Sequence, residues 1–232
     1  MSLNRLDAAP LARTLSRFGL GARDLAAPAS LVWLDLAERL IIASLFGSFA
    51  YRMLLDHTGM LYISGMLVVL SESLPFFFVI IRSTVGGLSQ RPSDWAIGIG
   101  ASLAPLMVQP HVNLNDMLAP GPVIYVIMIA GLFIQVSAKI VLGRGFGLIA
   151  ANRGVKTMGP YRVVRHPMYL GYMMTHVGFL LAAPSVLNAS AYALALTLQI
   201  IRIGREEAVL IQDPAYASLA RQVPYRLLPG VY

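Results

Sequence analysis

The chain has 232 residues and a net charge of +7, and 57% of its residues are hydrophobic while only 12% are charged. Because soluble domains carry about 25% charged residues, this composition excludes an ordinary soluble protein and indicates an integral membrane protein. The absence of cysteine excludes disulfides, thiolate catalysis and cysteine-ligated metals. The basic residues lie between apolar stretches, where they orient membrane loops, and we therefore expect the lipid bilayer and no nucleic acid as a partner.

The first part of the chain divides into a polar segment and a region of membrane spans. Residues 1–30 carry four arginines among leucine and phenylalanine, without the continuous apolar core of a cleaved signal peptide. We interpret them as a cytoplasmic N-terminal segment that is either an amphipathic surface helix or a tail. Residues 31–142 follow as N-terminal membrane spans. Their apolar runs predict spans at 31–55, 60–81, 95–108 and 122–142.

Two ionisable residues, Glu72 and His176, fall inside predicted apolar helices. Such groups are costly in a bilayer, so each is a candidate functional residue. The alternatives are that Glu72 closes a helix contact beside neighbouring serines and that His176 is a hydrogen-bonded structural residue. No second histidine, cysteine or acid stands at ligand spacing from His176, and the sequence predicts no metal site.

The C-terminal region, residues 143–232, begins with a loop of residues 143–165 that holds five basic residues and no acid. Pro167 lacks a backbone N–H and suits the first turn of a helix, so a helix is predicted over 167–183. After a break, a second apolar helix over 189–203 returns the chain to its starting side. The first arm is marginally short for a full crossing, and a re-entrant hairpin is the alternative.

The distribution of basic residues predicts the orientation of the bundle. Four segments hold four, two, five and four Lys or Arg residues, and they are residues 1–30, 82–94, 143–165 and 202–232. The connections on the opposite side hold none. The positive-inside rule then places both termini in the cytoplasm. The expected fold is an all-α polytopic membrane bundle of about five to six spans, with a C-terminal helical hairpin and a cytoplasmic C-terminal helix.

Charged residues end the second arm of this hairpin. Arg202 and Glu206 are four apart and therefore share one helix face, and Glu207 follows directly. The hairpin brings them back beside the loop and helix start that carry Tyr161 to Tyr169. The alternative is that the charges are only solvated at the membrane interface and paired along the helix.

These residues carry a resemblance to a known family. The run Gly159-Pro-Tyr-Arg-Val-Val-Arg-His-Pro-Met-Tyr-Leu-Gly171, followed by Arg-x-x-x-Glu-Glu at 202–207, resembles the isoprenylcysteine carboxyl methyltransferase family. The related phospholipid methyltransferases share much of this pattern. The resemblance covers residues 142–232 and implies an integral membrane methyltransferase that binds S-adenosylmethionine in a helical, cytoplasm-facing site on residues 143–232.

The resemblance also implies roles for individual residues. The residues expected to line the cofactor are Tyr161, His166, Tyr169 and Leu170. Arg202 and Glu206 match the family's Arg–Glu pair near the reacting centre, and Glu207 is expected beside the cofactor. The implied acceptor is lipid-like or hydrophobic, with carboxylate O-methylation of the isoprenylcysteine type favoured.

Three alternatives to this function remain at the level of sequence. The first is a phospholipid (ethanolamine) N-methyltransferase. The second is an NADPH-dependent membrane reductase of the sterol type, although Met168 and Tyr172 depart from the usual residues of that motif. The third is a non-enzymatic membrane protein that uses Glu72 and His176 as an ion path. We expect the protein in a bacterial inner membrane.

Overall fold

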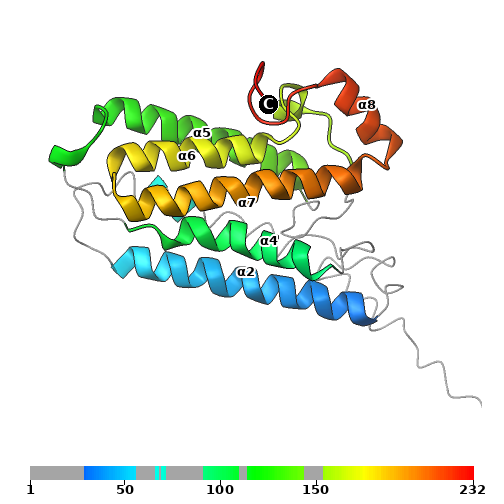
Figure 1. Ribbon diagram of the computed structural model, residues 1–232, viewed down its shortest axis with the longest axis horizontal. Helices are drawn as coiled ribbons and strands as arrows, with labels where there is room; N and C mark the ends of the chain where they lie inside the picture. The colour runs from blue at the N-terminus through cyan, green and yellow to red at the C-terminus, as the bar shows by residue number, and fades with distance from the viewer. Residues whose placement is uncertain (1–28, 56–65, 68, 72–90, 110–113, 144–153) are drawn as a thin grey trace, which may run out of the picture.

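The computed structural model describes residues 29–55, 66–67, 69–71, 91–109, 114–143 and 154–232. Every regular element in these ranges is helical, which confirms the all-α prediction for this part of the chain. The α-helices are α2 (Ala29–Leu55), α4 (Pro92–Leu103), α5 (Gly121–Leu142), α6 (Pro167–Ala182), α7 (Val186–Leu210) and α8 (Pro214–Gln222). The long axes of α2, α4, α5, α6 and α7 run in similar directions, and α8 lies at one end of the bundle near the C-terminus (Figure 1).

Two of the described helices, α5 and α7, are long and apolar enough to cross a membrane. The outer face of α5 supports a lipid environment, because Val126, Phe133 and Ile140 are 68%, 72% and 65% exposed. These residues are seven apart and therefore lie along one side of the helix. Such a continuous apolar stripe is uncommon on a surface that faces water.

The predicted spans agree with the helices in part. The predicted span 31–55 corresponds to α2 and the span 122–142 to α5. The span 95–108 is divided, because α4 ends at Leu103 and a 3₁₀ turn, Ala104–Met107, follows. Most of the span 60–81, Glu72 included, lies outside the described residues.

The hairpin of α6 and α7 is present, and its second arm extends beyond the predicted apolar run. Helix α6 begins at Pro167, as predicted, and α7 runs from Val186 to Leu210, so it includes the apolar run 189–203 and the charged residues that follow. Ser185 caps α7 by accepting a hydrogen bond from the backbone N–H of Asn188 at 3.0 Å. The extension carries the charged residues on the regular helix and so fixes their relative directions.

Helices α5 and α6 approach each other closely through glycines. A methyl group added at Gly171 would lie 2.5 Å from the carbonyl oxygen of Gly131, and one added at Gly131 would lie 2.7 Å from that of Gly171. Gly171, Thr175, Gly178 and Ala182 are all buried, as expected of the small-residue stripe that their spacing predicts. This contact fixes α6 against α5 and holds the start of α6 in place.

The core below the start of α6 contains a buried polar group and an aromatic stack. The Nζ of Lys139, which is fully buried, donates to Oε1 of Gln135 at 2.9 Å and lies 4.7 Å from the centre of the Tyr172 ring. His176 lies beside Tyr172 and stacks on Tyr192, with 4.4 Å between ring centres. The structure therefore places His176 within the packed core.

Candidate active site

The loop before α6 is shaped by a short turn and by the end of the chain. A 3₁₀ turn, Gly159–Arg162, starts with Gly159 at φ +59°, a backbone conformation that favours glycine. The backbone N–H groups of Arg165 and His166 donate to the carbonyl oxygens of Tyr225 and Arg226, each at 2.9 Å. Residues 223–232, the C-terminal segment, therefore hold this loop by backbone hydrogen bonds.

The C-terminal segment is itself closed by hydrogen bonds. The backbone N–H groups of Arg226, Leu227 and Leu228 all donate to the carbonyl oxygen of Tyr232, at 2.9, 2.7 and 3.0 Å. The guanidinium of Arg226 also lies over the Tyr232 ring, 5.1 Å from its centre. These contacts hold the backbone carbonyl groups of Tyr225 and Arg226, which accept hydrogen bonds from the backbone N–H groups of Arg165 and His166.

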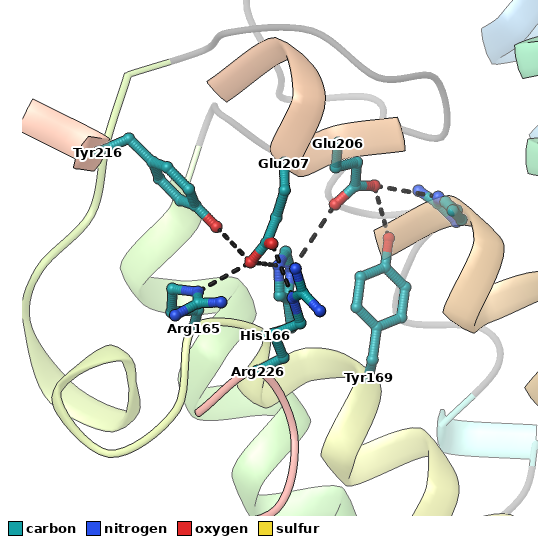
Figure 2. A network of polar contacts seen from close by, with 8 residues as sticks. Arg165, His166, Tyr169, Glu206, Glu207, Tyr216 and Arg226 are labelled. Atoms are coloured by element: carbon teal, nitrogen blue, oxygen red, sulfur yellow. Dashed lines mark hydrogen bonds and ion pairs between the residues drawn. The ribbon is translucent and has the colours of Figure 1, made fainter. Parts of the chain in front are cut away.

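Glu206 lies against the start of α6 (Figure 2). The hydroxyl of Tyr169 donates to Glu206 Oε1 at 2.6 Å, and Nε of Arg202 donates to the same oxygen at 3.1 Å. The other carboxylate oxygen lies 3.9 Å from Nδ1 of His166. The hairpin predicts that the charged end of α7 lies close to the start of α6, and these contacts confirm this prediction.

Glu207 points to the other side of the same helix end and is surrounded by donors (Figure 2). Its Oε1 accepts from Nε of Arg165 at 2.8 Å and from the hydroxyl of Tyr216 at 3.0 Å, and its Oε2 accepts from Nε of Arg226 at 2.7 Å. Nε2 of His166 lies 3.3 Å from Oε1. Because a carboxylate can only accept, this contact requires the proton of His166 on Nε2.

These contacts also shift the ionisation of the partners. The hydrogen bond to Glu207 raises the pKa of Arg226 above its usual value. Burial, with the nearby charge of Glu207, raises the pKa of Tyr216 well above its usual value. Glu207 therefore joins α7, α8, the loop before α6 and the C-terminal segment through hydrogen bonds from charged and neutral donors.

A pocket that is partly open to solvent lies beside Glu206. The predicted site residues that line it are Tyr161, His166, Tyr169 and Glu206. Burial, with the charge of Glu206 second, raises the pKa of Tyr161 far above its usual value, so its phenol is neutral. Three predicted site residues are not in its lining: Leu170 packs against the core, while Arg202 and Glu207 contact lining residues.

Several residues of the site have no role in the sequence prediction. Arg165, Tyr216 and Arg226 surround Glu207, and Lys156 lines the pocket. The excess of basic residues before α6 was a signal for a neutralising acid, but it did not indicate which of the two glutamates serves. Within the described residues, no group of three or more His, Cys, Asp or Glu side chains could hold a metal ion.

Part of the chain is similar to a known protein family. No curated protein matches the chain. Residues 123–215 match the family model described as phospholipid methyltransferase. The matched range includes nearly all of α5, the whole of α6 and α7, and the loop before α6, and it favours a methyltransferase over a reductase. This part of the chain is thus similar to the phospholipid methyltransferase family, and the similarity indicates a methyltransferase that uses S-adenosylmethionine.

Proposed function

We propose that this methyltransferase transfers the methyl group of S-adenosylmethionine to a carboxylate of a lipid-like acceptor, as in the isoprenylcysteine type. The observation that carries this proposal is that both glutamates of the site are already engaged by donors. Glu206 accepts from Tyr169 and Arg202, and Glu207 accepts from three side chains at 3.0 Å or less.

An ammonium group must lose a proton before its nitrogen can attack. Glu207 is a poor candidate for this general base, because three donors at 3.0 Å or less already occupy its two oxygens. A carboxylate acceptor is deprotonated at neutral pH and needs no such base. The site then contributes alignment of two bound partners and exclusion of water.

The pocket fits the cofactor by its lining, which combines aromatic rings with a few polar groups, as is usual for small-molecule sites. Aromatic rings of Tyr161, Tyr169 and Tyr216 supply flat surfaces for a purine, and Glu206 supplies a negative charge for a sulfonium or ammonium group. When bound, S-adenosylmethionine supplies an activated methyl group on a positively charged sulfur.

The proposed roles follow from these positions. Tyr161, His166 and Tyr169 hold the cofactor, and Leu170 supports them from the core side. Arg202 and Glu206 are the proposed catalytic pair, with Arg202 fixing the carboxylate of Glu206 and giving a positive charge for an anionic acceptor. Glu207 acts on the cofactor through His166 and Arg165, which it holds in place.

A second candidate is N-methylation of a phospholipid head group such as ethanolamine. It is favoured by the description of the matched family, phospholipid methyltransferase. In that case the amine must arrive neutral or lose its proton to water or His166, because the two glutamates are engaged.

We further propose a membrane arrangement and domain division. The protein has about five to six spans in a bacterial inner membrane, with the N- and C-termini in the cytoplasm. Residues 1–30 form a cytoplasmic segment, 31–142 form spans that precede the cofactor region, and 143–232 bind the cofactor. The apolar outer face of α5 and the helix lengths of α5 and α7 support this arrangement.

The test is a methyl-transfer assay in membranes that contain the protein. Membranes are incubated with S-adenosylmethionine labelled in its methyl group, and the labelled lipid is extracted and identified. Label released by mild base indicates an ester, and base-stable label on a head group indicates N-methylation. We expect base-labile label that is lost in Glu206→Gln. Base-stable label would refute the carboxylate acceptor, and no labelled lipid would refute the lipid acceptor altogether.

A further inference from the structure

The charged side chains that line the pocket are neutralised to different degrees. Arg165 donates to Glu207 at 2.8 Å and to the carbonyl oxygens of Val223 and Pro224, each at 2.8 Å. Glu206 is held by Arg202 at 3.1 Å. Both charges therefore have opposite charges or dipoles within hydrogen-bond distance inside the protein.

Lys156 is the exception among the charged pocket-lining residues. It lines the pocket and is partly buried, yet no hydrogen bond or ion pair joins it to another residue in the part of the chain that the structure describes. The sequence around it offers no local acid, because residues 143–165 contain none. The pocket thus carries a positive charge that its described lining does not balance.

The backbone beside Lys156 is anchored. The side chain of Val155 packs against the apolar cluster of Tyr216, Leu219 and Val223 under α8. This contact holds the segment against the C-terminal helices, so the lysine has a fixed attachment at the pocket wall. A flexible stem on a fixed backbone can bring an ammonium to a ligand with little cost in chain ordering.

We propose that Lys156 binds the anionic oxygen group, a carboxylate or a phosphate, of a ligand in this pocket. The inference rests on the proposed function and assigns a role to a residue that neither the resemblance nor the family match singles out. Two ligands of this enzyme class carry such a group: the cofactor, through the carboxylate of its methionine part, and the lipid-like acceptor, through its head group. In either case the anion balances the charge of the pocket.

The first arm of the test measures cofactor binding. Calorimetry with S-adenosylhomocysteine is carried out on the purified full chain and on Lys156→Gln, Lys156→Arg and Arg162→Gln. Arg162 is the matched control, because it lies in the same basic loop but is exposed and does not line the pocket. A charge-assisted hydrogen bond contributes about 1.5–3 kcal/mol, so its loss predicts an affinity that is about tenfold or more weaker.

An analogue of S-adenosylhomocysteine that lacks the carboxylate distinguishes a direct contact of Lys156 with this carboxylate from a general effect of the substitution on cofactor binding. If Lys156 binds the cofactor carboxylate, Lys156→Gln binds S-adenosylhomocysteine at least about tenfold more weakly but binds the decarboxylated analogue as the wild type does. Lys156→Arg keeps the charge and retains most of the affinity. Arg162→Gln and the wild type bind alike.

The second arm measures the acceptor side with farnesylated N-acetylcysteine and its uncharged amide as probes. If Lys156 binds the acceptor, Lys156→Gln binds S-adenosylhomocysteine normally and loses the preference of the wild type for the acid over the amide. Two results would overturn the proposal. The first is that Lys156→Gln changes neither the preference for S-adenosylhomocysteine over its decarboxylated analogue nor the preference for the acid over the amide. The second is that Arg162→Gln has the same effect as Lys156→Gln. Failure of the proposed function is a different result, in which the wild type itself binds no S-adenosylhomocysteine.

Discussion

Replacement of Glu207 by glutamine tests whether this residue holds the site together. Four side chains contact its carboxylate, and they come from the loop before α6, from α8 and from the C-terminal segment. Glutamine has nearly the same shape but no charge, so the variant removes two ion pairs while it preserves packing.

The expected loss of stability can be worked from exposure. The side chains of Glu207 and Arg165 are 13% and 9% exposed, and breaking a buried pair by removal of one charge costs about 3–5 kcal/mol. The side chain of Arg226 is 38% exposed, so solvent screens its pair with Glu207 and the contribution is below about 1 kcal/mol. We therefore expect a loss of about 3 kcal/mol, near the lower end of the range because some exposure remains.

The assay is thermal unfolding of the ligand-free protein in detergent, followed by circular dichroism. For a chain of this size, about 1 kcal/mol corresponds to about 2–4 °C in Tm, so we expect Glu207→Gln to lower Tm by about 6–12 °C. The control is Arg226→Gln, because it removes only the pair that solvent screens, which contributes below about 1 kcal/mol. Equal Tm values for the two variants would show that the contacts of Glu207 do not hold the site, and the reasoning would fail.

Three further predictions concern packing, catalysis and pH. Gly171→Leu should lower Tm by several degrees, because the added side chain meets the α5 backbone and overpacking costs about 1–3 kcal/mol. The control is Gly204→Ala, which has open space around it and should raise Tm by about 2–4 °C, because alanine is about 1 kcal/mol more favourable than glycine inside a helix. A Gly171→Leu variant as stable as Gly204→Ala would contradict the close contact. Tyr169→Phe removes the 2.6 Å hydrogen bond to Glu206 and should lower kcat about tenfold in the labelled-methyl assay, whereas an unchanged kcat would exclude this hydrogen bond from the reaction. Burial raises the pKa of Tyr216, so its neutral phenol contributes stability that is fully present below pH 10 and is lost as pH rises above 10. Above pH 10, the Tm of Tyr216→Phe should therefore fall less steeply with pH than the Tm of the wild type. Identical slopes would refute the raised pKa of Tyr216.

The sequence was sufficient for the local features of the site. Pro167 predicted the start of α6, and the four-residue spacing of Arg202 and Glu206 predicted their pairing on one face. The hairpin then predicted that Glu206 lies near Tyr169. Each of these inferences depends on residues that are close in sequence or joined by one turn, where periodicity and proline chemistry decide the geometry.

The apolar pattern and the helix of α7 end at different residues. The apolar pattern stops near Ile203, whereas the four-residue spacing of Arg202 and Glu206 predicts that the helix continues through the charged residues. Arginine, glutamate, alanine and leucine all favour helix, so the backbone continues to Leu210 after the apolar pattern has ended. Membrane exit and helix end are separate events here.

The division of labour between the two glutamates could not be predicted. Glu206 and Glu207 are neighbours, and their side chains point to different sides of α7. Glu207 is surrounded by residues from positions 165, 216 and 226, whose approach depends on tertiary contacts and on backbone hydrogen bonds of the C-terminal segment. Similarly, the small residues of α6 predicted a close helix contact, but only the structure identifies Gly131 of α5 as the partner of Gly171.

The backbone pairing between the C-terminal segment and the loop before α6 has a consequence for biosynthesis. Residues 223–232 emerge from the ribosome after all the helices of the bundle, so the helices can enter the bilayer before Arg165 and His166 receive their backbone partners. Insertion of the helices therefore does not require this pairing. A chain truncated after Gln222 retains every described helix but lacks the carbonyl partners of Arg165 and His166, and it should reside in the membrane and bind the cofactor more weakly than the full chain.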